Sequence, residues 1–336
     1  MKPLICGLLL AAVISTGCLP SPTGTVGNRT ITVYAFSIMK ESLERDIYPA
    51  FKEKWRQQHG EEITFNSSFA GSETITNQIL QGAPADIAIL SIEMDVDRLI
   101  TAGHVSADWW VTAERGIVNR TPFVILVRPG NPLGINDFAD LAKPGVKLIH
   151  PDPVSSGGAQ WSILSIYGSE LKKSEAAGGT KDEGKALDTL RSVWKNVIST
   201  PGSAREARTQ FETGYGDALI TYELEGLLMK QAGAPVDVVV PRSTIFSEHP
   251  GVVVERNVSA DEREAVYAFR NFLWSDEAQK AFVRNNFRSS VNESFDAANA
   301  GFAKIEMPFT VHYFGGWKKA YPDVIDAIFR KQVKGE

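Results

Sequence analysis

The chain has 336 residues, of which 43% are hydrophobic and 22% are charged, and its formal net charge is −5. This length is more than one hydrophobic core usually fills, and the composition is that of an ordinary globular protein, so we expect a pair of lobes. The sequence contains no run of lysines and arginines and no basic stripe, which argues against a nucleic-acid-binding protein.

The N-terminal stretch MKPLICGLLLAAVISTGC has the form of a secretory signal. A lysine precedes an apolar run at residues 4–14, which is too short for a comfortable membrane span. A small residue stands directly before Cys18, as in a bacterial lipobox, although Ser15 replaces the usual leucine. We therefore expect residues 1–17 to be a signal peptide and Cys18 to carry a lipid, with residues 18–28 as a Pro- and Gly-rich tether. The alternative is an ordinary signal peptide that is cut nearby, with Cys18 incidental.

Apolar patterning in the first third of the chain predicts strands that alternate with helices. Strands are expected at residues 30–35, 62–66 and 87–90. Apolar residues recur at every fourth position from Met39 to Trp55 and mark a helix between the first two strands. A second helix carries Ile75, Ile79 and Leu80. This order is typical of a doubly wound α/β lobe.

The rest of the chain repeats the same kinds of element. Further strands are predicted at residues 123–127, 146–149, 217–221 and 236–240. Further helices are predicted at residues 187–194, 205–212 and 261–282 and near the C-terminus, and residues 172–185 are predicted to be a solvated loop.

The chain is expected to cross between two lobes near residues 115–125 and 225–245. Residues 29–120 together with 243–336 are then lobe 1, and residues 121–242 are lobe 2. The predicted fold class is α/β, a two-lobed clamshell in which each lobe is a doubly wound mixed sheet flanked by helices.

Small and hydroxylated residues follow two of the predicted strands. PVSSGGAQWS, residues 153–162, precedes a helix expected from Ala159, and SFAGSE, residues 68–73, precedes another. Glycine lets a backbone approach a bound group closely, and a helix N-terminus presents free N–H groups that suit an anion. Such loops lie where open α/β sheets bind ligands. Each stretch alone is more often a turn or an ordinary helix cap.

Several motifs resemble the periplasmic sulfate- and thiosulfate-binding proteins of ABC importers, and the resemblance extends over nearly the whole mature chain. They are SFAGS (68–72), FVILVRPGNP (123–132), KPGVKLIHPDPVSSGGAQW (143–161), SAR (203–205), GDALITYE (216–223) and FGGW (314–317). The proline-flanked strand that leads into SSGGAQW is the most specific of them. FAGS and GAPAD also resemble molybdate-binding proteins.

The resemblance implies a type II periplasmic-binding-protein clamshell whose lobes close on a dehydrated tetrahedral dianion. It implies neutral hydrogen-bond donors, namely the hydroxyls of Ser72 and Ser156, the side chain of Tyr222, and the backbone N–H groups of Ile38, Gly157, Gly158 and Ala204. Ile38 stands where the family has an aspartate, but the backbone is the binding group there. Tyr222 stands where the family has a tryptophan, and molybdate-binding proteins place a tyrosine at that position. The sequence therefore does not decide whether the site prefers sulfate or molybdate.

The resemblance also implies a monomer in the periplasm or on the outer face of the cytoplasmic membrane, anchored through Cys18, that delivers sulfate or thiosulfate to permease subunits. No metal or other cofactor is expected. The alternatives are a molybdate or tungstate receptor of the same fold and a lipoprotein that senses an oxyanion without transport. An enzyme is not expected, because the sequence has no G-x-S-x-G, Walker or HExxH motif and its five histidines are scattered.

Overall fold

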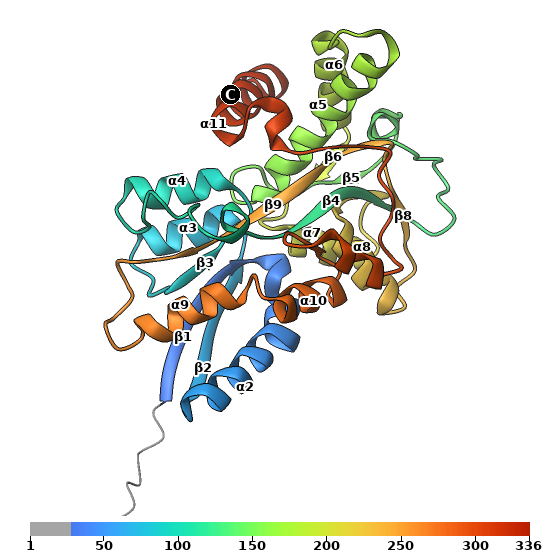
Figure 1. Cartoon of the computed structure of the whole chain (residues 1–336). Coiled ribbons are helices and arrows are strands. Elements are labelled where there is room, and N and C mark those ends of the chain that lie inside the picture. The colour runs from blue at the N-terminus through green and yellow to red at the C-terminus, as the bar shows by residue number, and fades with distance from the viewer. Residues whose placement is uncertain (1–27) are drawn as a thin grey trace, which may run out of the picture.

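The structure is a computed structural model that describes residues 28–336 (Figure 1). The predicted signal peptide, Cys18 and residues 18–27 of the predicted tether lie outside the described residues. The described strands are β1 (Asn28–Phe36), β2 (Glu62–Ala70), β3 (Ile87–Ile89), β4 (Ile117–Val127), β5 (Leu148–Ile149), β6 (Val197–Ser199), β7 (Ala218–Tyr222), β8 (Asp237–Val239), β9 (Ser243–Val253), β10 (Arg288–Ser289) and β11 (Met307–Phe309).

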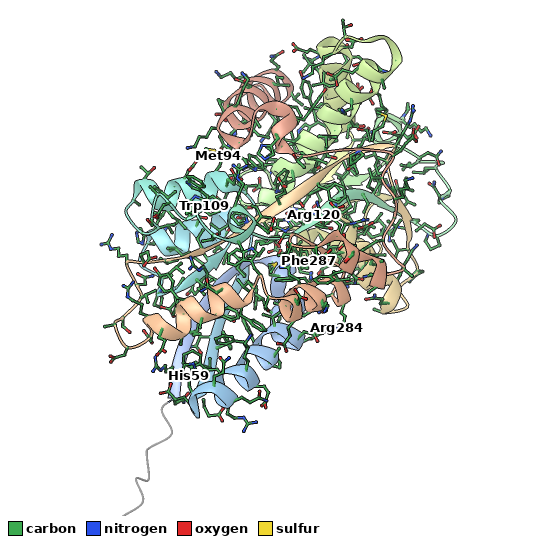
Figure 2. All side chains as sticks on the ribbon, viewed as in Figure 1. His59, Met94, Trp109, Arg120, Arg284 and Phe287 are labelled. Atoms are coloured by element: carbon green, nitrogen blue, oxygen red, sulfur yellow. The ribbon has the colours of Figure 1, made fainter. Side chains whose placement is uncertain are left out.

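Helices cover the sheet on its faces, and side chains fill the space between the elements (Figures 1 and 2). The α-helices are α1 (Lys40–Ser42), α2 (Tyr48–His59), α3 (Ser72–Leu80), α4 (Glu93–Thr101), α5 (Gly157–Gly178), α6 (Glu183–Trp194), α7 (Ala204–Glu212), α8 (Glu223–Gln231), α9 (Arg263–Phe272), α10 (Asp276–Arg284) and α11 (Trp317–Ala320). A 3₁₀ turn, η1 (Ser37–Met39), follows β1, and π-helical segments occur at η2 (Leu43–Ile47) and η7 (Tyr321–Lys334).

Two long central strands join the halves of the molecule. The sheet has the order β2-β1-β3-β9-β4-β7-β5-β6. Strand β4 pairs with β9 up to Pro122 and with β7 from Phe123 onward, both antiparallel. At its far end β9 pairs with β3 through residues 251–253. The mixed α/β sheet flanked by helices confirms the predicted fold class, and β4 and β9 are its crossing strands.

The structure differs from the sequence predictions in several places. Strand β9 is long and was not predicted, because it is buried on both faces and so lacks an alternating pattern. Helix α5 continues through Gly178, so residues 172–178 are helical rather than part of a loop. The predicted helix at 261–282 is interrupted between α9 and α10, where Ser275 Oγ accepts a hydrogen bond from the N–H of Ala278 and begins a new helix.

The C-terminal segment packs on the α5 side of the molecule. The segment η7 packs against α5 and α6, and α11 packs against η7 and contacts α4. The rings of Trp317 and Trp161 meet edge to face, with centroids 4.6 Å apart. This segment, which the sequence analysis assigned to lobe 1, therefore contacts elements on both sides of the crossing strands.

Candidate functional site

The N-terminus of α5 presents two unpaired backbone donors. Ser156 is buried and extended at the helix cap, its N–H donates to the carbonyl of Asp152 at 2.9 Å, and its side chain forms no capping bond. The helix begins at Gly157, two residues before the predicted start, so both glycines belong to the first turn. Within the described residues, the N–H groups of Gly157 and Gly158 have no intramolecular acceptor. This turn can therefore donate to a bound anion.

The N-terminus of α3 is arranged differently. Ser72 Oγ donates to Asp95 Oδ2 at 2.6 Å and accepts from the N–H of Ser91 at 2.9 Å. A hydroxyl has a single proton, so this serine hydroxyl is already used within the protein. Burial raises the pKa of Asp95 to about 6. What Ser72 still offers in this geometry is its backbone N–H, at the first position of α3.

Glycines let the two helix N-termini approach each other. A Cβ atom on Gly71 would clash with the carbonyl oxygens of Ser155 and Gly202, the latter at 2.7 Å. A Cβ atom on Gly157 would lie 2.7 Å from Ser91 Cβ, and one on Gly158 would lie 2.9 Å from Tyr222 Oη. Since real Cβ atoms do not tolerate such distances, the glycines are required by close packing across the site.

Ser91 connects the predicted residues, although it was not itself predicted as a site residue. Its hydroxyl lies 2.8 Å from Tyr222 Oη, its N–H donates to Ser72 Oγ, and its carbonyl accepts from Trp161 Nε1 at 2.7 Å. Ser91 directly follows the buried strand end Ile89–Leu90, at the sheet edge where ligands bind in such folds. A serine directly after a predicted buried strand was the sequence signal that could have identified Ser91.

Ile38 and Ala204 lie beside this cluster on packed elements. Ile38 is buried in η1, directly after β1, and the ring of Phe36 lies 6.2 Å from that of Tyr222. Ala204 is the first residue of α7, which packs against η1, and Ser203 Oγ caps that helix by accepting from the N–H of Glu206 at 3.2 Å.

The structure therefore brings the predicted binding residues into one buried region. Ser72, Gly157, Gly158 and Tyr222 meet around Ser91, Ser156 adjoins them along the chain, and Ile38 and Ala204 flank them.

Ion pairs surround this region. Arg205, next to Ala204, pairs with Glu225 Oε1 at 2.9 Å and with Glu41 Oε2 at 2.8 Å. On the other side, Gln160 Nε2 of α5 donates to Glu73 of α3. Burial, with a contribution from the Asp95 charge, raises the pKa of Glu73 to about 8.

His150 lies close to the site in sequence but serves the interior. It is buried, with Nδ1 2.7 Å from the carbonyl of Pro151 and Nε2 2.7 Å from Ser162 Oγ. Burial lowers its pKa to about 4, so the imidazole is neutral at pH 7. A neutral histidine that is bonded at both ring nitrogens supports local structure rather than offering charge to an anion.

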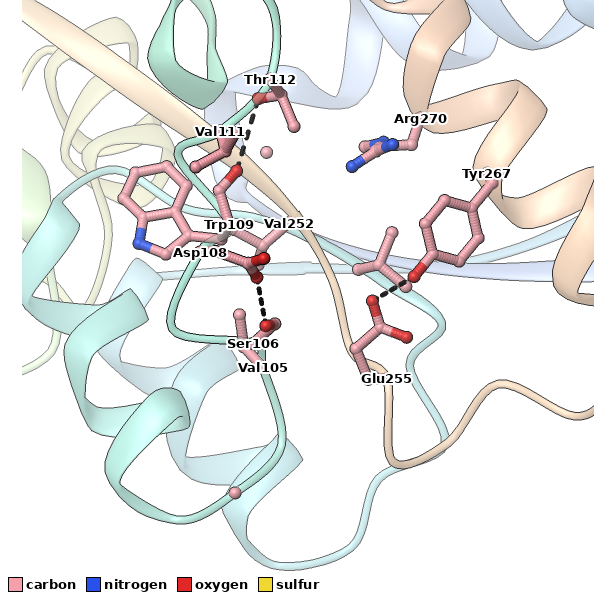
Figure 3. Close-up of a pocket in the computed structure, with 13 residues that line it drawn as sticks. Val105, Ser106, Asp108, Trp109, Val111, Thr112, Val252, Glu255, Tyr267 and Arg270 are labelled. Atoms are coloured by element: carbon pink, nitrogen blue, oxygen red, sulfur yellow. Dashed lines mark hydrogen bonds between the residues drawn. The ribbon is translucent and has the colours of Figure 1, made fainter.

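A surface cavity of about 560 Å³ lies elsewhere, between the 103–112 loop and α9 (Figure 3). Trp109, Tyr267 and Arg270 line it together with two carboxylates, and Glu255 accepts a hydrogen bond from the Tyr267 hydroxyl. The acidic side chains Asp108 and Glu255 make this cavity a poor receptor for a dianion.

Residues 28–336 contain neither a candidate metal-binding cluster nor a candidate membrane span. No group of three His, Cys, Asp or Glu side chains there is placed to hold a metal ion. None of the helices in that range is both long and apolar enough to cross a membrane.

Comparison with known proteins gives consistent matches over most of the chain. A family model described as "Bacterial extracellular solute-binding protein" matches residues 31–288. The sulfate-binding protein of Synechococcus elongatus is 33% identical over 296 residues, which cover 87% of this chain and 83% of the relative. The thiosulfate-binding protein of Escherichia coli (strain K12) is 35% identical over 291 residues, 84% of this chain and 82% of the relative.

A solved structure agrees with these relatives. The sulfate-binding protein SubI from Mycobacterium tuberculosis H37Rv superposes with a TM-score of 0.78 at 32% identity. The match covers 88% of this chain and 98% of SubI.

Proposed function

This chain belongs to the bacterial extracellular solute-binding proteins, in the sulfate- and thiosulfate-binding family, and we propose that it captures sulfate or thiosulfate for the permease of an ABC importer. The observation that carries the proposal is the meeting of two helix N-termini, α3 and α5, at close-packed glycines. Their unpaired N–H groups form a ready-made site for an oxyanion.

Neutral donors hold the anion in this proposal. The backbone N–H groups of Ile38, Ser72, Gly157, Gly158 and Ala204 and the hydroxyls of Ser156 and Tyr222 form the donor set. Ser72 contributes its N–H rather than its hydroxyl, because the hydroxyl proton is donated to Asp95. The role of Ser72 thus differs from the one that the sequence resemblance implied.

A site of backbone donors suits a dianion that has no proton to give. Sulfate at neutral pH can only accept hydrogen bonds, so each N–H is matched by a ligand oxygen. Helix dipoles stabilise the negative charge without a buried counter-ion, which would cost several kcal/mol to desolvate. Binding of this kind needs no reacting group, and we propose a binding protein rather than an enzyme.

Closure of two lobes around the anion is the proposed motion. In this proposal residues 29–120 with 243–336 form one lobe, residues 121–242 form the other, and β4 and β9 act as the hinge. The bond from Trp161 to Ser91 and the ion pair of Arg205 with Glu41 join the two sides. These contacts, together with a bound anion, favour the closed form. We also propose that Cys18 carries the lipid anchor after removal of residues 1–17.

Calorimetric titration of the purified protein tests the proposal. Co-purified anion is first removed by unfolding and refolding, and sulfate, thiosulfate, molybdate and phosphate are then titrated separately. We expect sulfate or thiosulfate to bind most tightly. Tighter binding of molybdate would favour the receptor type that Tyr222 resembles, and the absence of heat with every oxyanion would refute oxyanion capture.

A further inference from the structure

Two hydroxyl groups lie together against the first turn of α5. Ser91 Oγ and Tyr222 Oη are 2.8 Å apart, and either can be the donor. A Cβ atom on Gly157 would lie 2.8 Å from Ser91 Oγ, and one on Gly158 would lie 2.9 Å from Tyr222 Oη. Both oxygens therefore lie against the Cα atoms of the two glycines whose N–H groups are proposed to bind the anion.

The protein holds both hydroxyls in place. The N–H and the carbonyl of Ser91 are hydrogen-bonded to Ser72 and Trp161. The side-chain hydroxyl is therefore the one polar group of Ser91 whose hydrogen bond can change direction. The Tyr222 ring packs against the ring of Phe123, with centroids 4.5 Å apart, and is buried. The phenol and the serine thus form a fixed pair whose hydrogen-bond direction can reverse.

Counting protons gives the pair two states. When Ser91 donates to Tyr222, the phenol proton is free and the pair offers a donor to the ligand. When Tyr222 donates to Ser91, the phenol oxygen keeps free lone pairs and can accept a hydrogen bond from a protonated ligand, while the Ser91 hydroxyl can donate to another ligand oxygen. Backbone N–H groups and an indole can only donate, so a site built from those alone lacks the second state.

We propose that the Ser91–Tyr222 pair sets the anion selectivity of this site and lets it hold a singly protonated tetrahedral oxyanion, such as hydrogen phosphate, as well as sulfate. This inference rests on the proposed function. Hydrogen phosphate needs one acceptor for its proton, and an unpaired buried hydroxyl would be strongly rejected. Burial holds the pKa of the Tyr222 phenol above its ordinary value, so both protons of the pair are present at neutral pH.

The test is calorimetry of the full chain and its variants with sulfate and with phosphate, near pH 8, where phosphate is mostly the singly protonated dianion. The unmodified protein is expected to bind both, with sulfate the tighter. Ser91→Ala leaves Tyr222 without its acceptor, so its proton must go to the ligand. We expect the Kd for sulfate to change by less than about 3-fold and the Kd for phosphate to rise by at least about 10-fold.

Three further variants keep the result interpretable. Ser91→Cys preserves volume with only a weak donor and should shift the ratio of the two Kd values in the same direction, even if Ser91→Ala is poorly folded. Tyr222→Phe removes donor and acceptor together and should weaken both anions. Ser165→Ala removes a buried serine bond to Thr244, 3.0 Å away, and should leave the ratio unchanged.

Each outcome separates the two proposals. Sulfate binding without phosphate binding in the unmodified protein overturns the inference and leaves the proposed function standing. An unchanged ratio of the two Kd values in both Ser91 variants also overturns it. Failure of the unmodified protein to bind either anion overturns the proposed function itself.

Discussion

The N-termini of α3 and α5 contain the same residue types but use them differently. Each begins after a strand with a glycine and a serine close together, yet Ser72 is the first residue of its helix and Ser156 is the cap of the other. Asp95 takes the Ser72 hydroxyl proton, whereas the Ser156 side chain has no capping bond. One serine therefore builds the site, and the other is available to bind. A motif alone does not distinguish these roles.

The largest effect is expected from a carboxylate at the α5 N-terminus. Gly157→Asp places a negative charge beside the anion and a Cβ atom within 2.7 Å of Ser91 Cβ. We expect sulfate affinity to fall by more than about 100-fold, because a like charge in a poorly solvated site is repelled by several kcal/mol. Calorimetry measures the loss, with thermal unfolding as a check on folding. Gly184→Asp, on the exposed start of α6, is the control, and retained affinity in Gly157→Asp would refute the placement of the anion.

Removing each serine hydroxyl compares the two helices directly. Ser156→Ala should weaken sulfate binding about 10-fold, the effect of one lost hydrogen bond to a charged group, and should change stability little. Ser72→Ala should do the reverse, because it removes the hydroxyl donor to Asp95 Oδ2 and leaves the buried Ser91 N–H without its acceptor, while Asp95 Oδ1 keeps Arg98 at 3.6 Å. We expect it to cost about 1–3 kcal/mol in the free energy of unfolding, with a smaller change in affinity. Denaturant titration measures the free energy of unfolding of each variant, and calorimetry measures its sulfate affinity. If the two variants lose stability and affinity to the same extent, the proposed difference between Ser72 and Ser156 is wrong.

An ion pair across the proposed lobes should have a smaller effect. Glu41→Gln removes the carboxylate of α1 that pairs with Arg205, while the pair of Arg205 with Glu225 remains. Because the pair is only partly shielded from water, we expect sulfate affinity to fall by about 3-fold, and less at high salt. Glu53→Gln, which removes an exposed pair with Arg56 within α2, is the matched control. An equal effect of the two substitutions would argue against a role for Glu41 in closure.

The sequence was enough to predict the two helix N-termini, but it did not predict that Ser72 and Ser156 use their hydroxyls differently. Strand and helix periodicity locate both N-termini, and the motif resemblance supplies the residues that we propose as donors. The direction of the Ser72 hydroxyl depends on Asp95, which is 23 residues away in the chain and comes close only through the packing of α3 on α4. Ser91 carried no motif, and its three bonds reach Ser72, Trp161 and Tyr222 from separate elements. Such cross-chain hydrogen bonds leave no local pattern.

The last prediction concerns stability rather than affinity, through the proton on Glu73, which links α3 to α5 through Gln160. Burial, followed by the Asp95 charge, raises its pKa from 4.5 to about 8 in the folded protein. The folded state therefore keeps a proton that the unfolded state loses near its ordinary pKa, so the stabilisation is complete below about pH 4.5 and is lost as the pH rises through about 8.

Glu73→Gln mimics the protonated side chain and should flatten the fall in Tm across that interval. Thermal unfolding at a series of pH values compares this variant with the unmodified protein and with Glu62→Gln, which changes an exposed glutamate on β2. Coincident profiles for Glu73→Gln and the unmodified protein would mean that the Glu73 proton does not contribute to the pH dependence of stability.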